Sequence, residues 1–413
     1  MVAVPSEVPG IDTKQPIDIG SKEFLTNKAA YFRWLREEAP VCQGKISIIK
    51  VTLLSRYDDC TAMLKDPRFV RNRSTATGGR RFPFPIPKSV SFMAQSMIVE
   101  DNPGHHRLRS LVQKAFTSSA IARIEPRIEQ LTHELLDAAN QHPGPVDLMQ
   151  VYSLPIPVTV IKELVGVSDE DMPRFRHSMR ILSEGMSGWR MLRTLLWDLG
   201  AAGRFIAELI AEKRKNPGDD VLTGLIEAEE EGDRLSEDEL ISMVFLLIIA
   251  GYETTVHLIT NGVLTLLEHP GQLARLRAQP ELMESAVEEI LRVNGPIQST
   301  KPNYPIEDTE LHGVTIPKGA AVMPMFGAAN RDPAMFDQPE VFDIARTPNK
   351  HLSFGRGLHF CLGAPLARME TRIALTTLLE RSPNLRLAVA PEELEFQNVP
   401  AWNRYKSLPV FLG

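Results

Sequence analysis

The residues best suited to chemistry stand in one glycine-rich stretch, Phe354-Gly355-Arg356-Gly357-Leu358-His359-Phe360-Cys361-Leu362-Gly363, which runs into a predicted helix. A helix N-terminus carries partial positive charge and free amides, which stabilise a cysteine as the thiolate, and glycines let backbone amides approach the sulfur. This arrangement suits a thiolate ligand. A cysteine without such a setting is usually a buried, inert thiol.

A long apolar segment carries the second group of candidates. Ser236 and Glu239 form the pattern of a capping box, and the apolar periodicity then continues to about Leu267. Inside this segment stand Glu253 and Thr254, an acid and a hydroxyl that are costly to bury. Taken alone, the pair is best explained structurally, with Thr254 bonded to a carbonyl one turn earlier and Glu253 paired at the surface.

Two charged pairs follow helical spacing. His105 and Arg109 lie on one helix face, which lets two donors converge on carboxylates. Glu289 and Arg292 also share a face and can pair. By themselves, both patterns are equally typical of a solvated helix.

The whole cysteine loop resembles the haem-binding loop of the cytochromes P450, and other motifs of that family follow in order from about Phe32 to Leu412. The resemblance implies that Cys361 is the proximal ligand of haem b (iron protoporphyrin IX), a thiolate that favours O–O cleavage. It implies further haem contacts from the loop and from two helices: Phe354, Arg356, His359, Gly363, His105, Arg109, Ala250 and Gly251. Of these, His105, Arg109, Arg356 and His359 are the expected partners of the propionates.

The segment Ala250-Gly251-Tyr252-Glu253-Thr254-Thr255 resembles the oxygen-binding segment of the same family. In that family small residues leave room for dioxygen, so Thr254 would hydrogen-bond it and Glu253 would relay the protons that drive O–O heterolysis. The resemblance therefore implies a monooxygenase that inserts one oxygen atom from O2 into a small organic substrate, by hydroxylation or epoxidation.

The pair of Glu289 and Arg292 resembles the Glu-x-x-Arg element of the family, which is structural and is commonly completed by a second arginine. Arg346 and Arg331 are both candidates for that arginine. The chain departs from the family at one point, because Asn303 stands where many bacterial relatives have an arginine that binds a propionate. Lys301 could take over that contact.

Helical periodicity dominates the chain, and the segments with this pattern are 28–38, 57–64, 105–116, 120–139, 157–165, 170–184, 189–215, 236–267, 272–278, 282–293 and 364–379. Alternating stretches at 46–54 and 296–326 indicate strands, and 71–97 is predicted to be a long irregular loop. The predicted fold class is mainly α with a minor β part. By resemblance this is the triangular P450 fold, one domain covering 1–413, with a long central helix over the haem and an irregular segment at about 1–20.

Composition sets limits on the class of protein. The net charge of −6 and the pI near 6.0 give no nucleic-acid footprint. Cys42, Cys60 and Cys361 show neither a disulfide framework nor Cys-x-x-Cys spacing, which indicates a reducing compartment. No secretion signal is evident, and the longest apolar run, 240–251, is shorter than the roughly 20 residues of a membrane span. A cytoplasmic protein without a membrane anchor is expected.

The substrate is predicted to be hydrophobic, such as a terpenoid, steroid-like or fatty compound. By analogy its pocket would be lined by mostly apolar residues: Phe82, Phe84, Ile86, Phe92, Met93, Val244, Leu247, Ile297 and Trp402. The chain shows no dinucleotide signature, flavin domain or iron-sulfur cysteine cluster, so electrons are expected from a separate ferredoxin and its ferredoxin reductase. Arg109, Lys114 and Arg356 could attract this acidic donor.

Three alternatives are open. A peroxide-driven peroxygenase of the same fold usually lacks the acid and hydroxyl pair, so Glu253 and Thr254 argue against it. A non-oxygenating member of the family, such as an isomerase or dehydratase, has no particular support. A haem-based sensor or binding protein without turnover is a different class, and consumption of oxygen would exclude it.

Overall fold

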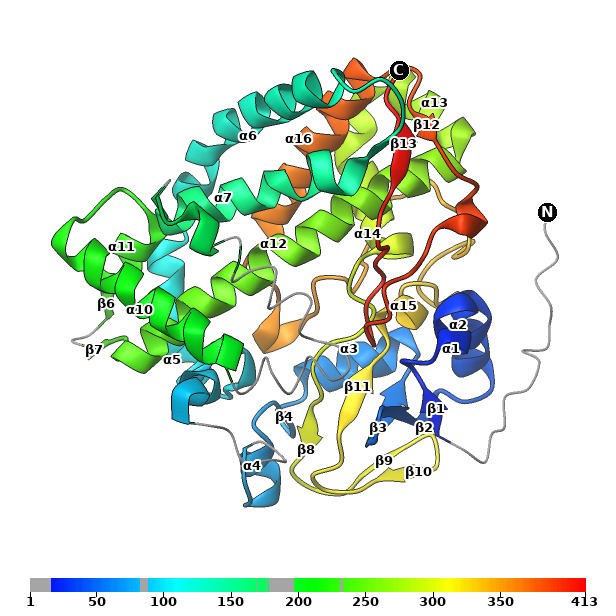
Figure 1. Cartoon of the computed structure of the whole chain (residues 1–413). Coiled ribbons are helices and arrows are strands. Elements are labelled where there is room, and N and C mark those ends of the chain that lie inside the picture. Colours follow the sequence, from blue (N-terminus) through cyan, green and yellow to red (C-terminus); the bar gives the residue numbers. More distant parts are fainter. Residues whose placement is uncertain (1–15, 82–87, 169, 176, 178–196, 231–232) are drawn as a thin grey trace.

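Helices make up most of the protein, and its strands are short (Figure 1). The computed structural model describes residues 16–81, 88–168, 170–175, 177, 197–230 and 233–413. Its α-helices are α1 (Lys22–Thr26), α2 (Lys28–Glu37), α3 (Tyr57–Lys65), α4 (Arg73–Thr77), α5 (Gly104–Ala115), α6 (Ser118–Ala139), α7 (Pro155–Val165), α10 (Leu199–Lys215), α11 (Val221–Glu227), α12 (Glu237–Glu268), α13 (Pro270–Ala278), α14 (Met283–Asn294), α15 (Phe326–Ala329) and α16 (Ala364–Arg381).

The longest helix, α12, crosses the middle of the molecule, and α7, α10, α14 and α16 pack against it (Figure 1). It begins at the predicted capping box, in which the Ser236 hydroxyl accepts from the Glu239 amide and the Glu239 carboxylate accepts from the Ser236 amide. In the described part of the chain it is the one helix long and apolar enough to cross a membrane, yet most of it is buried inside the protein. Its hydrophobicity is therefore that of a core helix.

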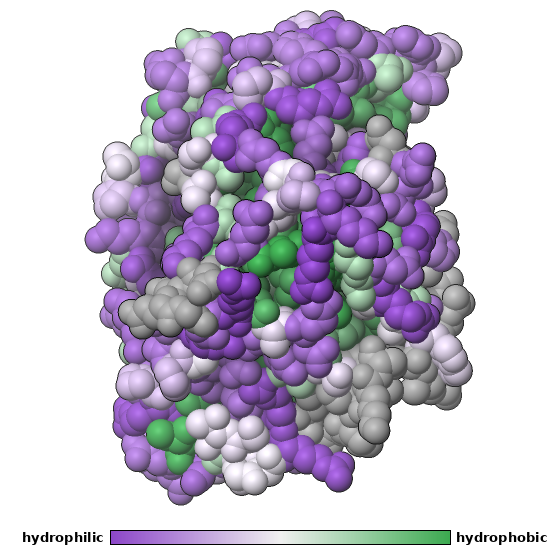
Figure 2. Space-filling model, turned by 90° about the vertical axis from the view of Figure 1, so that its left-hand side faces the viewer, coloured by the Kyte–Doolittle hydropathy of each residue, from purple (hydrophilic) through white to green (hydrophobic). Residues whose placement is uncertain are grey.

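The strands form small sheets beside the helical body. The largest has the order β1-β2-β3-β11, with β2 and β3 antiparallel and β11 parallel to β3. The strands are β1 (Ile17–Asp18), β2 (Val41–Ile46), β3 (Ile49–Leu54), β4 (Phe69–Val70), β5 (Val146–Asp147), β6 (Glu229–Glu230), β7 (Asp233–Arg234), β8 (Tyr304–Pro305), β9 (Thr309–Leu311), β10 (Val314–Ile316), β11 (Val322–Pro324), β12 (Arg386–Leu387) and β13 (Pro409–Phe411). Figure 2 shows a mainly hydrophilic face, with apolar groups visible in a hollow near its centre.

Most predicted elements are confirmed within one or two residues, but the segment 71–97 is not the irregular loop expected from its sequence. It contains α4 and a 3-10 helix at Lys88–Gln95. Phe82, Phe84 and Ile86 lie outside the described residues, and so do most of the predicted helix 170–184 and the beginning of the helix 189–215. The β2–β3 hairpin begins earlier than predicted, at Val41.

An ion network centred on a fully buried pair of α14 ties the helical body to the chain that leads into the cysteine loop. Two nitrogens on one edge of the Arg292 guanidinium group donate to the Glu289 carboxylate, with Nε–Oε2 at 2.7 Å and Nη2–Oε1 at 2.8 Å. Arg346 donates from Nε to Glu289 Oε1 at 3.1 Å and completes the triad. Arg331, the other candidate, binds Glu340 and the Val293 carbonyl instead.

We predict that Glu289→Gln lowers the free energy of unfolding by about 3–5 kcal/mol, because two buried arginines lose their counter-charge. The matched control is Glu340→Gln, because Glu340 also contacts two arginines, Arg36 and Arg331, but its side chain is 41% exposed. That exposed carboxylate should contribute less than about 1 kcal/mol. Urea unfolding of both variants makes the comparison, and equal losses would contradict the assignment of Glu289 as a structural centre.

Candidate functional site

The cysteine loop is held closed by its own backbone. The amide of Cys361 donates to the Phe354 carbonyl at 3.0 Å, and the amide of Gly355 donates to Leu352 at 2.7 Å. Gly357 has φ of +69°, and a Cβ there would lie 2.3 Å from the Leu64 carbonyl oxygen, so only glycine fits. The loop therefore packs against the end of α3 and delivers Cys361 to the first turn of α16.

Opposing influences act on the Cys361 thiol. Burial raises its pKa, while the amides of Gly363 and Ala364 and the guanidinium groups of Arg109 and Arg368 oppose that shift. Amides and cations that favour the anion are what a thiolate ligand needs, and a bound metal ion adds to the same effect. By contrast, burial alone raises the pKa of Cys42 to about 12.

Two histidines and two arginines gather beside this loop. The rings of His105, on α5, and His359 lie with centroids 4.4 Å apart in an edge arrangement. Burial and the charge of Arg109 lower the pKa of His105 to about 4, and burial and the charge of Arg71 lower that of His359 to about 2. Both imidazoles are therefore neutral at pH 7, beside two guanidinium groups.

Arg71 is a member of this cluster that no sequence pattern indicated. Its side chain is buried, with Nη2 donating to Thr300 Oγ1 at 2.6 Å and Nη1 donating to the Lys301 carbonyl. The Asp101 carboxylate fixes its main chain by accepting from the Arg71 amide at 2.7 Å. Burial lowers the pKa of Arg71 to about 10, which leaves it charged at neutral pH.

At Asn303, where the sequence departs from the family pattern, the backbone is part of a β-bridge. Asn303 forms a β-bridge with Val322, through a pair of backbone hydrogen bonds of 2.8 Å, and its side chain is buried. Arg71 reaches the neighbouring residues Thr300 and Lys301 from the other side of the chain. A guanidinium group is thus present close to the position where the family resemblance led us to expect one, but it comes from a different segment.

One face of α12 is open although the helix is otherwise buried. Ala250 is exposed and Thr254, one turn later, is partly exposed. Thr254 donates its hydroxyl to the Ala250 carbonyl at 2.8 Å, as the structural interpretation of the sequence had it. Gly251 serves packing, because a Cβ there would lie 2.3 Å from Ile161 Cδ1 on α7. Ala250 and Gly251 were both predicted to leave room beside this helix. Of the two, Ala250 is the residue that lies on the exposed face.

Glu253 has a buried partner where the structural interpretation expected one at the surface. Its carboxylate forms an ion pair with Nη1 of Arg404, and the two side chains are only 10% and 2% exposed. Arg404 lies close to the C-terminal end of the chain, far from Glu253 in sequence. No local pattern connects the two.

The predicted pocket residues divide into two groups. Leu247, Ile297 and Trp402 are partly exposed, and a β-bridge places Ile297 directly beside Trp402. Val244 is fully buried in the main core, so no accessible face of it is available to a pocket in this structure. Phe92 and Met93 pack in a small cluster with Leu199, Ala202 and Phe245, which places Phe92 in the core as well.

Unpartnered donors test whether these residues fit a haem. Buried side-chain nitrogens without a hydrogen-bond partner include Nδ1 of His105, Nε2 of His359 and Nε of Arg71, all in the cation cluster. Such atoms are costly unless a ligand satisfies them. A group that carries two carboxylates and a metal fits both the cluster and the thiol of Cys361.

The comparisons with known proteins agree with this geometry. The sequence model of the family described as cytochrome P450 matches residues 26–392. The chain belongs to the cytochrome P450 family. It is 39% identical to the polyketide biosynthesis cytochrome P450 PksS of Bacillus subtilis, over 95% of this chain and 97% of that protein.

The 6-deoxyerythronolide B hydroxylase of Saccharopolyspora erythraea is 37% identical, over 96% of this P450 and 98% of the relative. The solved structure of PksS superposes with a TM-score of 0.89 at 38% identity, covering 96% and 99% of the two chains. This protein is accordingly a haem-dependent monooxygenase of the soluble bacterial type, with the mainly α P450 fold.

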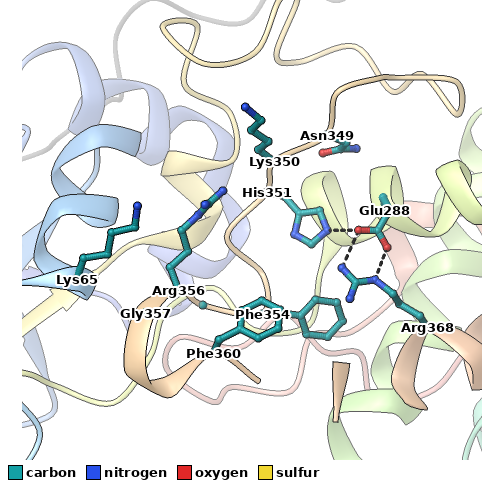
Figure 3. Close-up of a pocket in the computed structure, with 11 residues that line it drawn as sticks. Lys65, Glu288, Asn349, Lys350, His351, Phe354, Arg356, Gly357, Phe360 and Arg368 are labelled. Atoms are coloured by element: carbon teal, nitrogen blue, oxygen red, sulfur yellow. Dashed lines mark hydrogen bonds and ion pairs between the residues drawn. The ribbon is translucent and has the colours of Figure 1, made fainter. Parts of the chain in front are cut away.

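On the outer side of the cysteine loop, the P450 has a hollow of about 340 Å³ beside Phe360, whose ring is 41% exposed (Figure 3). Four of its lining residues are cationic: Lys65, Lys350, Arg356 and Arg368. Glu288 forms one wall, where it accepts from Arg368 Nε at 2.6 Å and lies 3.1 Å from His351 Nε2. Burial raises the pKa of Glu288, but these bonds prevail and hold it at about 2.

Proposed function

We propose that this P450 hydroxylates or epoxidises a hydrophobic organic molecule, with Cys361 as the thiolate ligand of haem b. The observation that carries the proposal is the set of buried donors without partners, on His105, His359 and Arg71, beside the Cys361 loop. In the overall reaction one atom of O2 enters the substrate and the other leaves as water, which consumes a pair of electrons and a pair of protons.

The haem, when bound, supplies the redox chemistry that activates dioxygen. The protein's own contribution is to hold the thiol, the propionates, the substrate and the protons. Thr254 presents its hydroxyl on the open face of α12, oriented by the Ala250 carbonyl. Glu253, in the next position and ion-paired with Arg404, is the acid group that would pass protons towards that face.

Labelled dioxygen tests the reaction class. Turnover under isotopically labelled O2 should give a product that carries one labelled oxygen atom, together with labelled water. A product that takes its oxygen from solvent, or turnover without oxygen consumption, would contradict a monooxygenase. Hydrogen peroxide as sole oxidant should support far less turnover than the complete electron-transfer system.

Arg71 takes the place of the propionate arginine that is missing at Asn303. Its charge, its burial and the free Nε provide a charge-assisted donor, which is the kind that binds carboxylates most strongly. His105, His359, Arg109 and Arg356 complete the set. In the structure without ligands Arg109 donates to the Phe360 carbonyl at 2.9 Å and Arg356 donates to the Tyr57 hydroxyl at 3.0 Å, so both lie at the loop.

We predict that Arg71→Gln accelerates the loss of haem to an acceptor apoprotein by roughly tenfold or more, since a hydrogen bond to a charged group contributes about 1.5–3 kcal/mol. Arg73→Gln is the matched control, because Arg73 is a close sequence neighbour whose hydrogen bond to the Arg80 carbonyl is solvent-exposed. Equal loss rates in both variants would contradict the assignment of Arg71.

The open face of α12 and the pair of Ile297 and Trp402 favour an apolar substrate. Relatives are named for polyketide biosynthesis and for hydroxylation of 6-deoxyerythronolide B, which agrees with a bulky apolar molecule of this kind. The substrate is best sought by shifts in the haem spectrum over a panel that includes polyketide, steroid-like and fatty ligands. Binding of polar ligands alone would exclude the apolar assignment.

Electrons come from a separate donor that docks on the cationic hollow beside Phe360. A ferredoxin, supplied by its reductase in the cytoplasm, fits a surface that presents Lys65, Lys350, Arg356 and Arg368 around an exposed ring (Figure 3). Opposite charges steer such encounters, and salt screens them over about 10 Å at 0.1 M.

We predict that Lys350→Glu slows reduction of the P450 by a ferredoxin several-fold at low salt, and that the difference from the parent shrinks at high salt. Lys50→Glu is the control, because Lys50 is equally exposed but lies on β3, outside the hollow. Stopped-flow reduction measures both rates. Reduction that is independent of salt would exclude docking on this face.

A further inference from the structure

A tight turn that precedes β13 carries Trp402 to the predicted pocket. The Trp402 amide donates to the Val399 carbonyl at 3.2 Å, and between them Ala401 has φ of +63°. A positive φ is unfavourable for a residue with a Cβ, so such a turn persists only where its surroundings hold it. The β-bridge to Ile297 places the turn beside the other predicted pocket residue. The position of the indole ring therefore depends on contacts made from outside the turn.

Asn403 connects this turn to four other segments. Its amide donates to the Pro296 carbonyl at 2.8 Å, and its carbonyl accepts from Asn261 Nδ2, on α12, at 2.9 Å. Its buried side chain donates from Nδ2 to Asn294 Oδ1, at the end of α14. The side-chain oxygen accepts from Lys28 Nζ at 3.0 Å. All four hydrogen-bonding groups of Asn403 are thus in use, and Lys28 is the partner from the N-terminal part of the chain.

Lys28 begins α2 and makes three contacts with this region (Figure 1). Its Nζ donates to the Trp402 carbonyl at 3.3 Å and to Asn403 Oδ1, and it lies 4.5 Å from the centroid of the Phe396 ring. All three partners are uncharged. Burial and the charge of Arg331 lower the pKa of Lys28 to about 7, so the ammonium and amine forms are both present near neutral pH. Both forms have N–H groups to donate, so the two hydrogen bonds do not require the charge.

We propose that Lys28 is a positioning residue of the substrate pocket, which holds Trp402 beside Ile297 through the Trp402 carbonyl and the Asn403 side chain. This inference rests on the proposed function, because it takes Trp402 and Ile297 as part of the pocket wall. Lys28 acts through the turn and is not itself part of that wall. A wall that is held in position keeps its contacts with an apolar ligand, whereas binding to a wall that can move away costs the free energy of ordering it.

N-alkylimidazoles of increasing chain length measure the wall in the holoenzyme without turnover. The free ring nitrogen of each ligand binds the haem iron and shifts the haem spectrum, so all members of the series share one anchor. The alkyl chain then adds apolar contact, which is worth up to roughly fourfold in affinity for each methylene group that becomes buried. The affinity of the parent should therefore rise with chain length.

We predict that Lys28→Met weakens binding of the long-chain ligands several-fold and leaves binding of N-methylimidazole unchanged. Methionine keeps an unbranched side chain over the Phe396 ring but has no N–H group to donate. Lys28→Arg keeps the donors and should restore most of the dependence on chain length. Lys406→Gln is the matched control, because Lys406 binds Glu395 on the same C-terminal segment, but both side chains are exposed.

Hydrogen exchange separates a positioning role from a general loss of stability. In Lys28→Met, exchange should become faster in peptides that cover 296–299 and 396–405, because the Gln298 amide donates to the Ala401 carbonyl and the Asn403 amide donates to Pro296. Exchange in α6, which is remote from this junction in sequence, should match that of the parent. Faster exchange throughout the protein would mean that Lys28 only stabilises the fold, and would overturn the inference.

A double variant tests whether Lys28 acts through the indole. In Trp402→Ala the side chain of the wall is removed, so adding Lys28→Met should cause no further loss of affinity for the long-chain ligands. Additive losses would overturn the inference. A dependence on chain length in Lys28→Met equal to that of the parent would overturn it as well.

Measurements on the parent keep the inference apart from the proposed function. A parent without a thiolate-type band in the presence of carbon monoxide would refute the proposed function, together with the inference that rests on it. A parent that shows the band but binds short and long N-alkylimidazoles equally well would refute the apolar wall and the role of Lys28, while the haem-thiolate assignment would stand. A graded series in the parent that is flattened in Lys28→Met supports the inference.

Discussion

The proposed haem site has to keep one cysteine sulfur in the interior as an anion, against the cost of burial. In the protein alone the net effect is a raised pKa of the Cys361 thiol, so a bound metal ion would complete the ionisation. Burial raises the pKa of Cys361, and the loop opposes it with the amides of Gly363 and Ala364 and with the nearby guanidinium groups. These donors are effective only if the loop is rigid. That rigidity comes from Gly357, which lets the loop pack on α3, and from the Glu289 network, which fixes the chain leading into it.

The balance of positive and negative charge also explains the cluster of basic side chains beside the cysteine loop. The cluster of His105, His359, Arg71 and Arg109 has two charged guanidinium groups and two imidazoles that are kept neutral by burial and by those charges. A dianionic ligand would relieve this excess of positive charge, and the unpartnered nitrogens are the groups that would bind its oxygens. On α12 opposite charges are paired within the protein, where the Glu253 carboxylate forms an ion pair with Arg404.

Local patterns predicted the helices and the cysteine loop, since periodicity, the capping box and glycine spacing are properties of neighbouring residues. They could not choose between Arg346 and Arg331 or find Arg71 and Arg404, because those contacts join residues far apart in sequence. The burial of Val244 follows from helical spacing. At 3.6 residues per turn it lies about 240° around the helix from Ala250, while Leu247 lies on nearly the same side. The single-domain assignment and the site roles stay predictions.

The most direct test of the account is the absorption spectrum of the purified protein, reduced with dithionite and exposed to carbon monoxide, beside a Cys361→Ala variant. The account predicts the red-shifted band of a haem-thiolate in the parent and its loss in the variant. A protein that binds no haem, or a variant whose spectrum matches that of the parent, would contradict the assignment of Cys361 as the iron ligand.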